Sequence, residues 1–104
     1  MTDVIVIGGG AAGWAAALAA AQEGATVVLV EKLAESGGSS ALSGGCLAFA
    51  GTDLQAAADI EDSPDALFAD LREVGQDVND AALVRTYCDE QLEAYSWLGQ
   101  AGVR

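Results

Sequence analysis

Residues 4–31 read VIVIGGGAAGWAAALAAAQEGATVVLVE, and this stretch decides the fold. The run VIVI is apolar and β-branched, which predicts a parallel strand over about 3–7, buried on both faces. An alanine-rich segment predicts a helix over about 11–23, which Gly24 ends. A second apolar run predicts a strand over about 26–30. The stretch therefore predicts a βαβ unit and an α/β fold.

The glycines between the first strand and the helix have the spacing G-x-G-x-x-G. Gly8 permits a tight turn, Gly10 lets the backbone approach a pyrophosphate, and Gly13 lets the helix pack closely on the sheet. The helix N-terminus presents unpaired N–H groups and its positive dipole end to the phosphates. Glu31 ends the second strand, where a carboxylate accepts hydrogen bonds from ribose hydroxyls. This combination predicts a dinucleotide site, the alternative being a βαβ unit whose glycines serve packing alone.

The rest of the chain has three parts. Residues 32–45 form a loop rich in glycine and serine, either an ordered ligand-binding segment or a flexible linker. A short strand is expected over 46–50, with Cys46 buried in it. Two acidic amphipathic helices are expected within 63–102, one starting at Ser63-Pro64 and ending at Gly75, the other capped by Asn79 or Asp80. The aromatic residues of these helices are more typical of a core than of a substrate site. The apolar positions of the two helices are Ala66, Leu67, Phe68, Leu71, Val74, Leu83, Val84, Tyr87, Leu92, Tyr95, Trp97 and Leu98.

Length, charge and cysteine content exclude several classes of function. The chain has 104 residues and a net charge of −12, with most acids after residue 50, so nucleic acid and anionic membranes are not expected partners. An acidic docking surface for a basic protein is an alternative to plain solvated helix faces. Cys46 and Cys88 lack C-x-x-C spacing and the chain has no histidine, so no metal site is expected. We expect a cytoplasmic protein, because two isolated thiols suit a reducing compartment. The sequence also shows no signal peptide before the first strand and no helix suited to a bilayer.

The chain has two glycine clusters, the first at residues 8–13 and the second at residues 37–45, and together they resemble a known family. The glycine motif, Glu31-Lys32, Gly37-Gly38 and Ser43-Gly44-Gly45 are similar to the FAD-binding domain of the fumarate reductase/succinate dehydrogenase flavoprotein superfamily. This superfamily includes 3-ketosteroid Δ1-dehydrogenases and L-aspartate oxidases. The resemblance covers nearly all of this chain but only about a fifth to a quarter of a typical member, and a whole dinucleotide-binding fold has more strands than this chain shows. It implies a Rossmann-like FAD-binding βαβ unit (3–31), then a flavin loop (32–45), a short strand and two acidic helices. Residues 1–104 would then be the incomplete N-terminal portion of a single FAD-binding domain.

The resemblance also implies where FAD is bound. The pyrophosphate would lie against the first glycine motif and Ala12, the adenosine ribose would bind Glu31 with Lys32 beside it, and the flavin would lie along the loop. Backbone N–H groups there would lie near flavin N5, where they stabilise charge on the reduced ring. Members of the succinate dehydrogenase type bond the flavin covalently through a histidine, but Gly38 stands at that place here, which implies non-covalent FAD. The implied FAD-binding residues are Gly8, Gly10, Ala12, Gly13, Glu31, Lys32, Gly38, Ser39, Ser40, Ser43, Gly44 and Gly45.

The function implied is that of an FAD-dependent oxidoreductase. It would transfer hydride between flavin N5 and a C–C bond activated by a carbonyl or carboxylate, in a small fumarate-like or ketosteroid-like substrate. The acid and base groups of the family would lie beyond Arg104, so no catalytic residue is assigned. Two alternatives stay open at this point: a non-catalytic flavoprotein fragment, and an NAD(P)-dependent dehydrogenase, which would not need the loop of residues 37–45. We also expect that these 104 residues alone do not form a well-folded monomer that binds flavin tightly.

Overall fold

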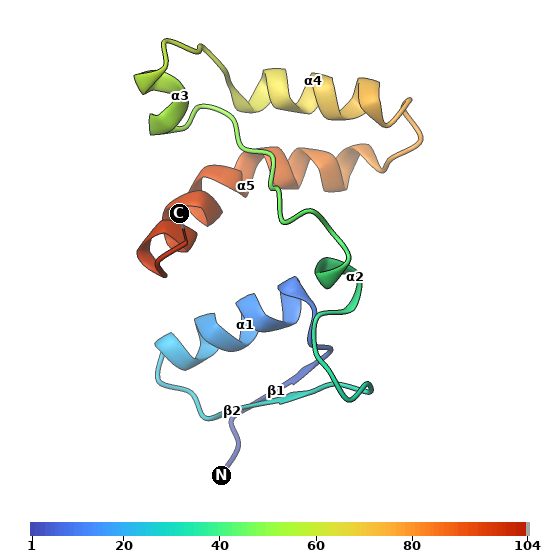
Figure 1. Cartoon of the computed structure of the whole chain (residues 1–104), viewed down its shortest axis with the longest axis vertical. Helices are drawn as coiled ribbons and strands as arrows, with labels where there is room; N and C mark the ends of the chain where they lie inside the picture. Colours follow the sequence, from blue (N-terminus) through green and yellow to red (C-terminus); the bar gives the residue numbers. More distant parts are fainter. Residues whose placement is uncertain (104) are drawn as a thin grey trace. The chain divides into compact units, whose positions relative to one another are not determined.

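The computed structural model describes residues 1–103 and contains two compact units, residues 1–46 and the described residues from Leu47 onward. The first unit contains β1 (Val4–Ile7), α1 (Ala11–Gln22), β2 (Val27–Val30) and α2 (Gly38–Ala41). The second contains α3 (Asp53–Ala57), α4 (Pro64–Val74) and α5 (Ala81–Gln100) (Figure 1). The predicted order of a βαβ unit, a loop and two main helices is therefore confirmed.

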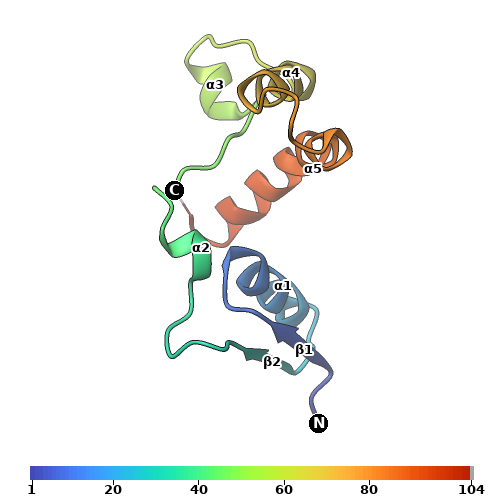
Figure 2. The same cartoon turned by 90° about the vertical axis from the view of Figure 1, so that its right-hand side faces the viewer.

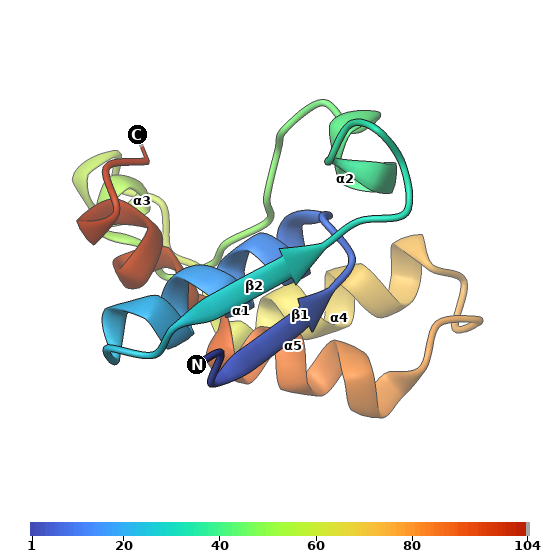
Figure 3. The same ribbon diagram turned by 90° about the horizontal axis from the view of Figure 1, so that it is seen from below.

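The two strands of the first unit form a parallel pair. Val4 is in register with Val27 and Ile7 with Val30, and the two strands run side by side in the same direction (Figure 3). The pairing continues beyond both ends of the strands, because Asp3 N–H donates to Thr26 O at 2.9 Å and Gly8 N–H donates to Val30 O at 2.8 Å. Parallel strands need a crossover connection, and α1 provides it.

Helix α1 covers one face of this sheet (Figure 2). Side chains alternate along both strands between half-buried and exposed, as the period of two in a strand requires. On the opposite face Ile5 is 65% exposed and Ile7 86%, with Val28 and Val30 exposed beside them. The prediction that the first strand is buried on both faces is therefore wrong for the described residues: its apolar sequence suits two covered faces, and one is covered here.

Helices α4 and α5 begin where side chains cap them. The Ser63 side chain accepts a hydrogen bond from Ala66 N–H with Pro64 at the first helical position, and Asp80 accepts from Ala82 and Leu83 N–H. Gly75 ends α4, as predicted. Asp80, not Asn79, is the cap of α5, because Asn79 instead donates through its side chain to Leu71 O at 2.8 Å. Neither these nor any other helix of the described residues is long and apolar enough to cross a membrane.

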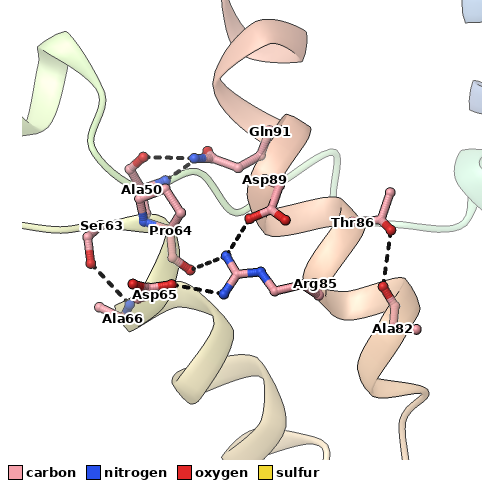
Figure 4. A network of polar contacts seen from close by, with 10 residues as sticks. All are labelled: Ala50, Ser63, Pro64, Asp65, Ala66, Ala82, Arg85, Thr86, Asp89 and Gln91. Carbon is pink, nitrogen blue, oxygen red and sulfur yellow. Dashed lines mark hydrogen bonds and ion pairs between the residues drawn. The ribbon is translucent and has the colours of Figure 1, made fainter.

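The core of the second unit is small. Ala50, Leu67 and Cys88 are buried, and Phe68, Leu71 and Val84 pack against them. Arg85 lies with its guanidinium carbon 4.9 Å from the centre of the Phe68 ring and forms ion pairs with Asp65 and Asp89 at 2.9 and 2.7 Å (Figure 4). Other positions of the predicted stripes are exposed, Val74 by 82% and Leu83 by 71%. The apolar pattern thus identifies the core only in part.

The structure differs from the sequence prediction between residues 32 and 62. The predicted strand over 46–50 is not formed, because no other described segment pairs with this backbone as a strand. Cys46 is accordingly exposed and not buried, and both cysteines are free. Two short helices were missed: α2 lies inside the predicted loop, and α3 is held by a capping box between Thr52 and Gln55.

Candidate functional site

The turn between β1 and α1 requires two of its glycines, one for its backbone angle and one for packing. Gly8 has a φ of +103°, a region that other residues rarely adopt. A Cβ added at Gly13 would lie 1.8 Å from Gly8 O, so α1 could not approach the end of β1 as it does. The roles predicted for Gly8 in the turn and for Gly13 in close helix packing are confirmed. At Gly10 an added Cβ would meet only ordinary contacts, with Ser40 Oγ at 3.7 Å and Gly37 O at 3.8 Å, so its protein neighbours do not require glycine there.

The N-terminus of α1 presents backbone donors. The cap residue Gly10 has no side chain to accept from them. Ala11 N–H donates to Ser40 Oγ at 3.1 Å, whereas within residues 1–103 the structure gives the N–H groups of Ala12 and Gly13 no acceptor. Open donors at a helix N-terminus, reinforced by the helix dipole, suit the oxygens of a phosphate. The start of α1 thus has donors that suit a pyrophosphate, and the pyrophosphate position stays a prediction.

Glu31 is joined to the first glycine cluster. One carboxylate oxygen accepts from Gly9 N–H at 2.8 Å, and the other accepts from Leu33 N–H at 3.0 Å. The hydrogen bond from Gly9, with the second from Leu33, lowers the pKa of the Glu31 carboxyl below its ordinary value. Glu31 therefore stays ionised near neutral pH, with both carboxylate oxygens able to accept hydrogen bonds.

A pocket of about 400 Å³ opens at the carboxyl ends of the two strands, lined by Ile7, Gly8, Val30, Glu31 and Lys32. Ligands of parallel α/β sheets bind at this end of the strands. The pocket has an apolar wall from the strand ends and two charged residues at its edge. Such a lining suits a ligand that has both apolar and polar groups. Among residues 1–103 no group of side chains that could hold a metal ion is found.

The second glycine cluster lies against the first. Gly37 N–H donates to Gly9 O at 2.7 Å, and an added Cβ at Gly9 would lie 2.8 Å from Ser36 Cβ. Gly37 itself has a φ of +133°, and a Cβ there would lie 2.6 Å from the Ala41 Cβ. Sequence reasoning missed Gly9 and Gly37 as site residues, although the run of three consecutive glycines is a signal that the middle one is also required.

The loop residues predicted to hold flavin fall into two groups. Ser40, in α2, reaches the N-terminus of α1, where its Oγ accepts from Ala11 N–H. Beyond α2 the hydrogen bonds are local: Ser43 Oγ donates to Ser40 O at 2.7 Å, and Gly45 N–H donates to Ser43 Oγ at 3.2 Å. The predicted residues Gly38, Ser39, Ser43, Gly44 and Gly45 are all exposed, and Gly38 and Gly45 have positive φ. The turn after β1 and Glu31 are therefore held by hydrogen bonds between distant residues. The loop beyond α2 is exposed and has only local hydrogen bonds.

Comparison with known proteins gives the family. The sequence model of the FAD binding domain matches residues 3–104. The chain belongs to the FAD-binding domain family. FAD is thus the cofactor of the family to which the chain belongs, and the resemblance drawn from the two glycine clusters is confirmed.

Members of the family with known activity are similar over nearly all of this chain. It is 40% identical over 100 residues to the fumarate reductase (cytochrome) of Shewanella frigidimarina, covering 96% of this chain and 18% of that protein. It is 44% identical over 96 residues to the urocanate reductase of Eggerthella lenta, covering 92% of this chain and 16% of that protein. The chain therefore spans less than a fifth of the length of these relatives.

A solved structure agrees with this assignment. The 3-ketosteroid-Δ4-(5α)-dehydrogenase of Rhodococcus jostii, solved with 4-androstene-3,17-dione, superposes with a TM-score of 0.78 at 36% identity. The superposition covers 96% of this chain and 21% of that protein. The FAD-binding α/β fold predicted from the sequence is thus confirmed.

Proposed function

We propose that this chain holds FAD in a flavin-dependent oxidoreductase that acts on a C–C bond next to a carbonyl or carboxylate. The observation that carries the proposal is the N-terminus of α1, where the N–H groups of Ala12 and Gly13 have no acceptor. The preceding Gly9 N–H donates to the ionised Glu31, and the chain belongs to an FAD-binding family. FAD, when bound, supplies the hydride chemistry at flavin N5. The residues of this chain supply binding, orientation and electrostatics.

The proposed binding mode follows the donors and acceptors described above. The amides at the start of α1, with Gly8 and Gly10 leaving space, hold the pyrophosphate, and Ser40 lies beside them. Glu31 accepts from the adenosine ribose, and Lys32 lies at the same pocket. Ser39, Ser43, Gly44 and Gly45 lie along the ribityl chain and the isoalloxazine ring, with Gly38 at the start of that loop. The exposure of this loop supports a role in contact with a ligand.

The substrate class is proposed from the names of the relatives. They are reductases of fumarate, acrylate and urocanate and a dehydrogenase of a 3-ketosteroid. Each of these compounds has a C–C bond that is conjugated, or becomes conjugated, with a carboxylate or ketone, which favours hydride transfer to or from the carbon β to that group. We propose a small molecule of this class as substrate, with the catalytic acid and base on residues beyond 104. The cytoplasmic location expected from the cysteines stays a prediction.

The experiment uses the full-length protein that carries these residues, loaded with FAD and reduced without oxygen. Fumarate, acrylate, urocanate and a 3-ketosteroid are added separately, and return of the oxidised flavin spectrum is followed. Rapid reoxidation by one of them, with the saturated or desaturated product identified, supports the proposal. Flavin that reacts with none of them, in either direction of electron flow, contradicts the substrate class. Tight binding of NAD(P) with no bound flavin would support the nicotinamide alternative.

FAD is proposed to be held non-covalently. Gly38 stands where the covalent members carry histidine, and the chain has no histidine. Denaturing the yellow holoprotein in acid and passing it through a filter should release all the flavin into the filtrate. Flavin retained with the polypeptide would contradict this part of the proposal.

A further inference from the structure

Gly9 is buried, and both of its backbone polar groups are bonded to segments that are distant in the sequence. Its N–H donates to Glu31 Oε2 at 2.8 Å, just beyond the end of β2. Its carbonyl oxygen accepts from Gly37 N–H at 2.7 Å, at the start of the second glycine cluster. All three residues belong to the first compact unit. Gly9 therefore joins the turn after β1, the end of β2 and the loop.

These two bonds fix a part of the backbone that has little conformational preference of its own. Gly8, Gly9 and Gly10 are consecutive, and glycine loses more conformational freedom on folding than any other residue. The peptide units on either side of Gly9 are planar, so only its two backbone dihedrals set their relative orientation. Glu31 holds the first of these units through its N–H, and the second unit carries the carbonyl that holds Gly37. Glu31 thus restrains the residue on which the loop depends.

Residues 36–40, the docked segment, lie on this turn. Besides the bond from Gly37 N–H, Ser40 Oγ accepts from Ala11 N–H at 3.1 Å, at the start of α1. Ser36 lies so close that a Cβ added at Gly9 would be 2.8 Å from the Ser36 Cβ. Gly9 does not have a positive φ, so space and not backbone angle requires glycine there. The docked segment therefore takes its position from Gly9 and from the start of α1.

We propose that Glu31 is a positioning residue for the docked segment, acting through Gly9, in addition to its proposed contact with the ribose. The carboxylate fixes Gly9 N–H, and the turn so fixed places the Gly9 carbonyl that holds Gly37. Loss of the carboxylate should loosen the docked segment and weaken FAD binding even to a ligand without ribose hydroxyls. The inference rests on the proposed function, in which Ser39 and Ser40 of this segment contact FAD. It couples the ribose end of the site to the loop end.

The test separates this role from the ribose contact by changing the ligand. The probe is an FAD analogue whose adenosine ribose lacks the 2′ and 3′ hydroxyl groups, titrated into the full-length protein freed of FAD. If Glu31 acts on the ribose alone, Glu31→Ala leaves the Kd of this analogue unchanged. We expect instead a Kd about tenfold higher, near the lower end of the effect of losing one hydrogen bond to a charged group. Glu31→Gln keeps an oxygen that can accept from Gly9 N–H and should restore most of this affinity.

Asp3→Ala is the matched control. Asp3 Oδ2 accepts from Thr26 N–H at 2.8 Å, so it makes the same kind of bond between the same two strands at their opposite ends. Its removal should lower the stability of the first unit without changing the Kd of FAD or of the analogue. An equal rise in Kd for Asp3→Ala and Glu31→Ala would reduce Glu31 to a general stabiliser and overturn the proposal.

The path through Gly9 has a test from the side of the loop. Gly9→Ala places a methyl group against Ser36 and should weaken binding of both FAD and the analogue. Adding Ser36→Gly removes the Cβ that this methyl group meets and should recover part of the loss. The recovery stays incomplete because Glu31 Oε2 would still lie 3.3 Å from the new Cβ. If Glu31→Ala does not fold, this pair of variants decides, and a double variant that recovers nothing contradicts the proposal.

Amide hydrogen exchange at Gly37 reports the docked segment without any ligand. Exchange should accelerate in Glu31→Ala, return toward the wild-type rate in Glu31→Gln and stay unchanged in Asp3→Ala. If the full-length wild type binds no FAD, the proposed function fails, while exchange at Gly37 still tests the positioning role. If wild type binds FAD and Glu31→Ala alters neither the Kd of the analogue nor this exchange, the positioning role is wrong and the proposed function stands.

Discussion

At the scale of single residues, Glu31 links the glycine turn to the expected ribose. Its carboxylate accepts from Gly9 and Leu33 N–H and still has capacity to accept further hydrogen bonds, and Glu31 lines the pocket at the strand ends. Glu31→Ala should weaken FAD binding by about 1.5–3 kcal/mol, the range for hydrogen bonds to a charged group. Glu31→Gln should have a smaller effect, because an amide oxygen still accepts. Titration of FAD into both full-length variants measures this, and an unchanged Kd in Glu31→Ala would contradict the ribose assignment.

The same carboxylate predicts a dependence on acid. The pKa of Glu31 is lowered in the folded protein. Its hydrogen bonds therefore contribute their full stability at pH values above the ordinary pKa of a glutamate carboxyl. That contribution is lost as the pH falls through the lowered pKa. FAD affinity should therefore hold through the ordinary pKa of glutamate and decline as the pH falls through the lowered pKa of Glu31. Glu31→Gln, which does not titrate, should lack this part of the decline. Identical acid profiles in the two proteins would show that another group is responsible.

Gly13 is the position where a single methyl group has the largest steric consequence. A Cβ there would lie 1.8 Å from Gly8 O, so Gly13→Ala must move the start of α1 away from the end of β1. We expect FAD binding to fall below detection and the unfolding temperature to drop. Gly99→Ala is the control, because a Cβ at that position of α5 meets nothing within 4 Å and alanine should stabilise the helix by about 0.5–1 kcal/mol. Normal flavin content in Gly13→Ala would contradict the packing described for this turn.

At the scale of elements, side-chain caps stand at the starts of the two main helices of the second unit. Asp80 accepts from both Ala82 and Leu83 N–H at the start of α5, the longest helix. Asp80→Ala should lower the free energy of unfolding by about 0.5–2 kcal/mol. Asp80→Asn keeps the accepting oxygen and should recover most of this loss. Denaturant unfolding of the full-length variants provides the measurement, and equal stability of Asp80→Ala and wild type would show that Asp80 does not cap the helix in solution.

At the scale of the whole molecule, the apolar surface exceeds what these residues cover. One face of the sheet exposes Ile5, Ile7, Val28 and Val30, while the buried hydrophobic residues among those described are Ala17, Ala50, Leu67 and Cys88. Exposed apolar area of this kind leads to association or partial unfolding, and a small core leaves only a few kcal/mol of stability, about 3–5 at most.

We therefore expect the 104-residue chain, prepared alone, not to behave as a well-folded monomer that binds flavin tightly. High negative charge can keep it in solution without folding it. Sedimentation, calorimetry and flavin titration of the isolated chain test this together. A monomer with a sharp cooperative melt and micromolar FAD binding would show that the residues suffice on their own.

The sequence by itself determined the local parts of this protein. Strands, helix starts and glycine roles depend on residues close in the chain: a β-branched run, a serine before a proline, a glycine where φ must be positive. The spacing of the glycine motif and Glu31, with the second glycine cluster, was enough to predict an FAD-binding fold, which the family comparison confirms. Short-range rules suffice for these features because their energies arise within a few residues.

The tertiary structure decided the contacts between distant segments. Gly9 needs to be glycine because Ser36 lies against it. Ser40 accepts from Ala11 N–H at the start of α1 because the path of the loop brings it there. Residues 46–50 have the composition of a strand, yet strand pairing needs a partner that the described residues do not supply, and Gln91 satisfies Ala50 instead. A sequence pattern records the preference of each segment, whereas hydrogen bonds and burial between segments depend on where the others lie, so these features could be known only from the folded chain.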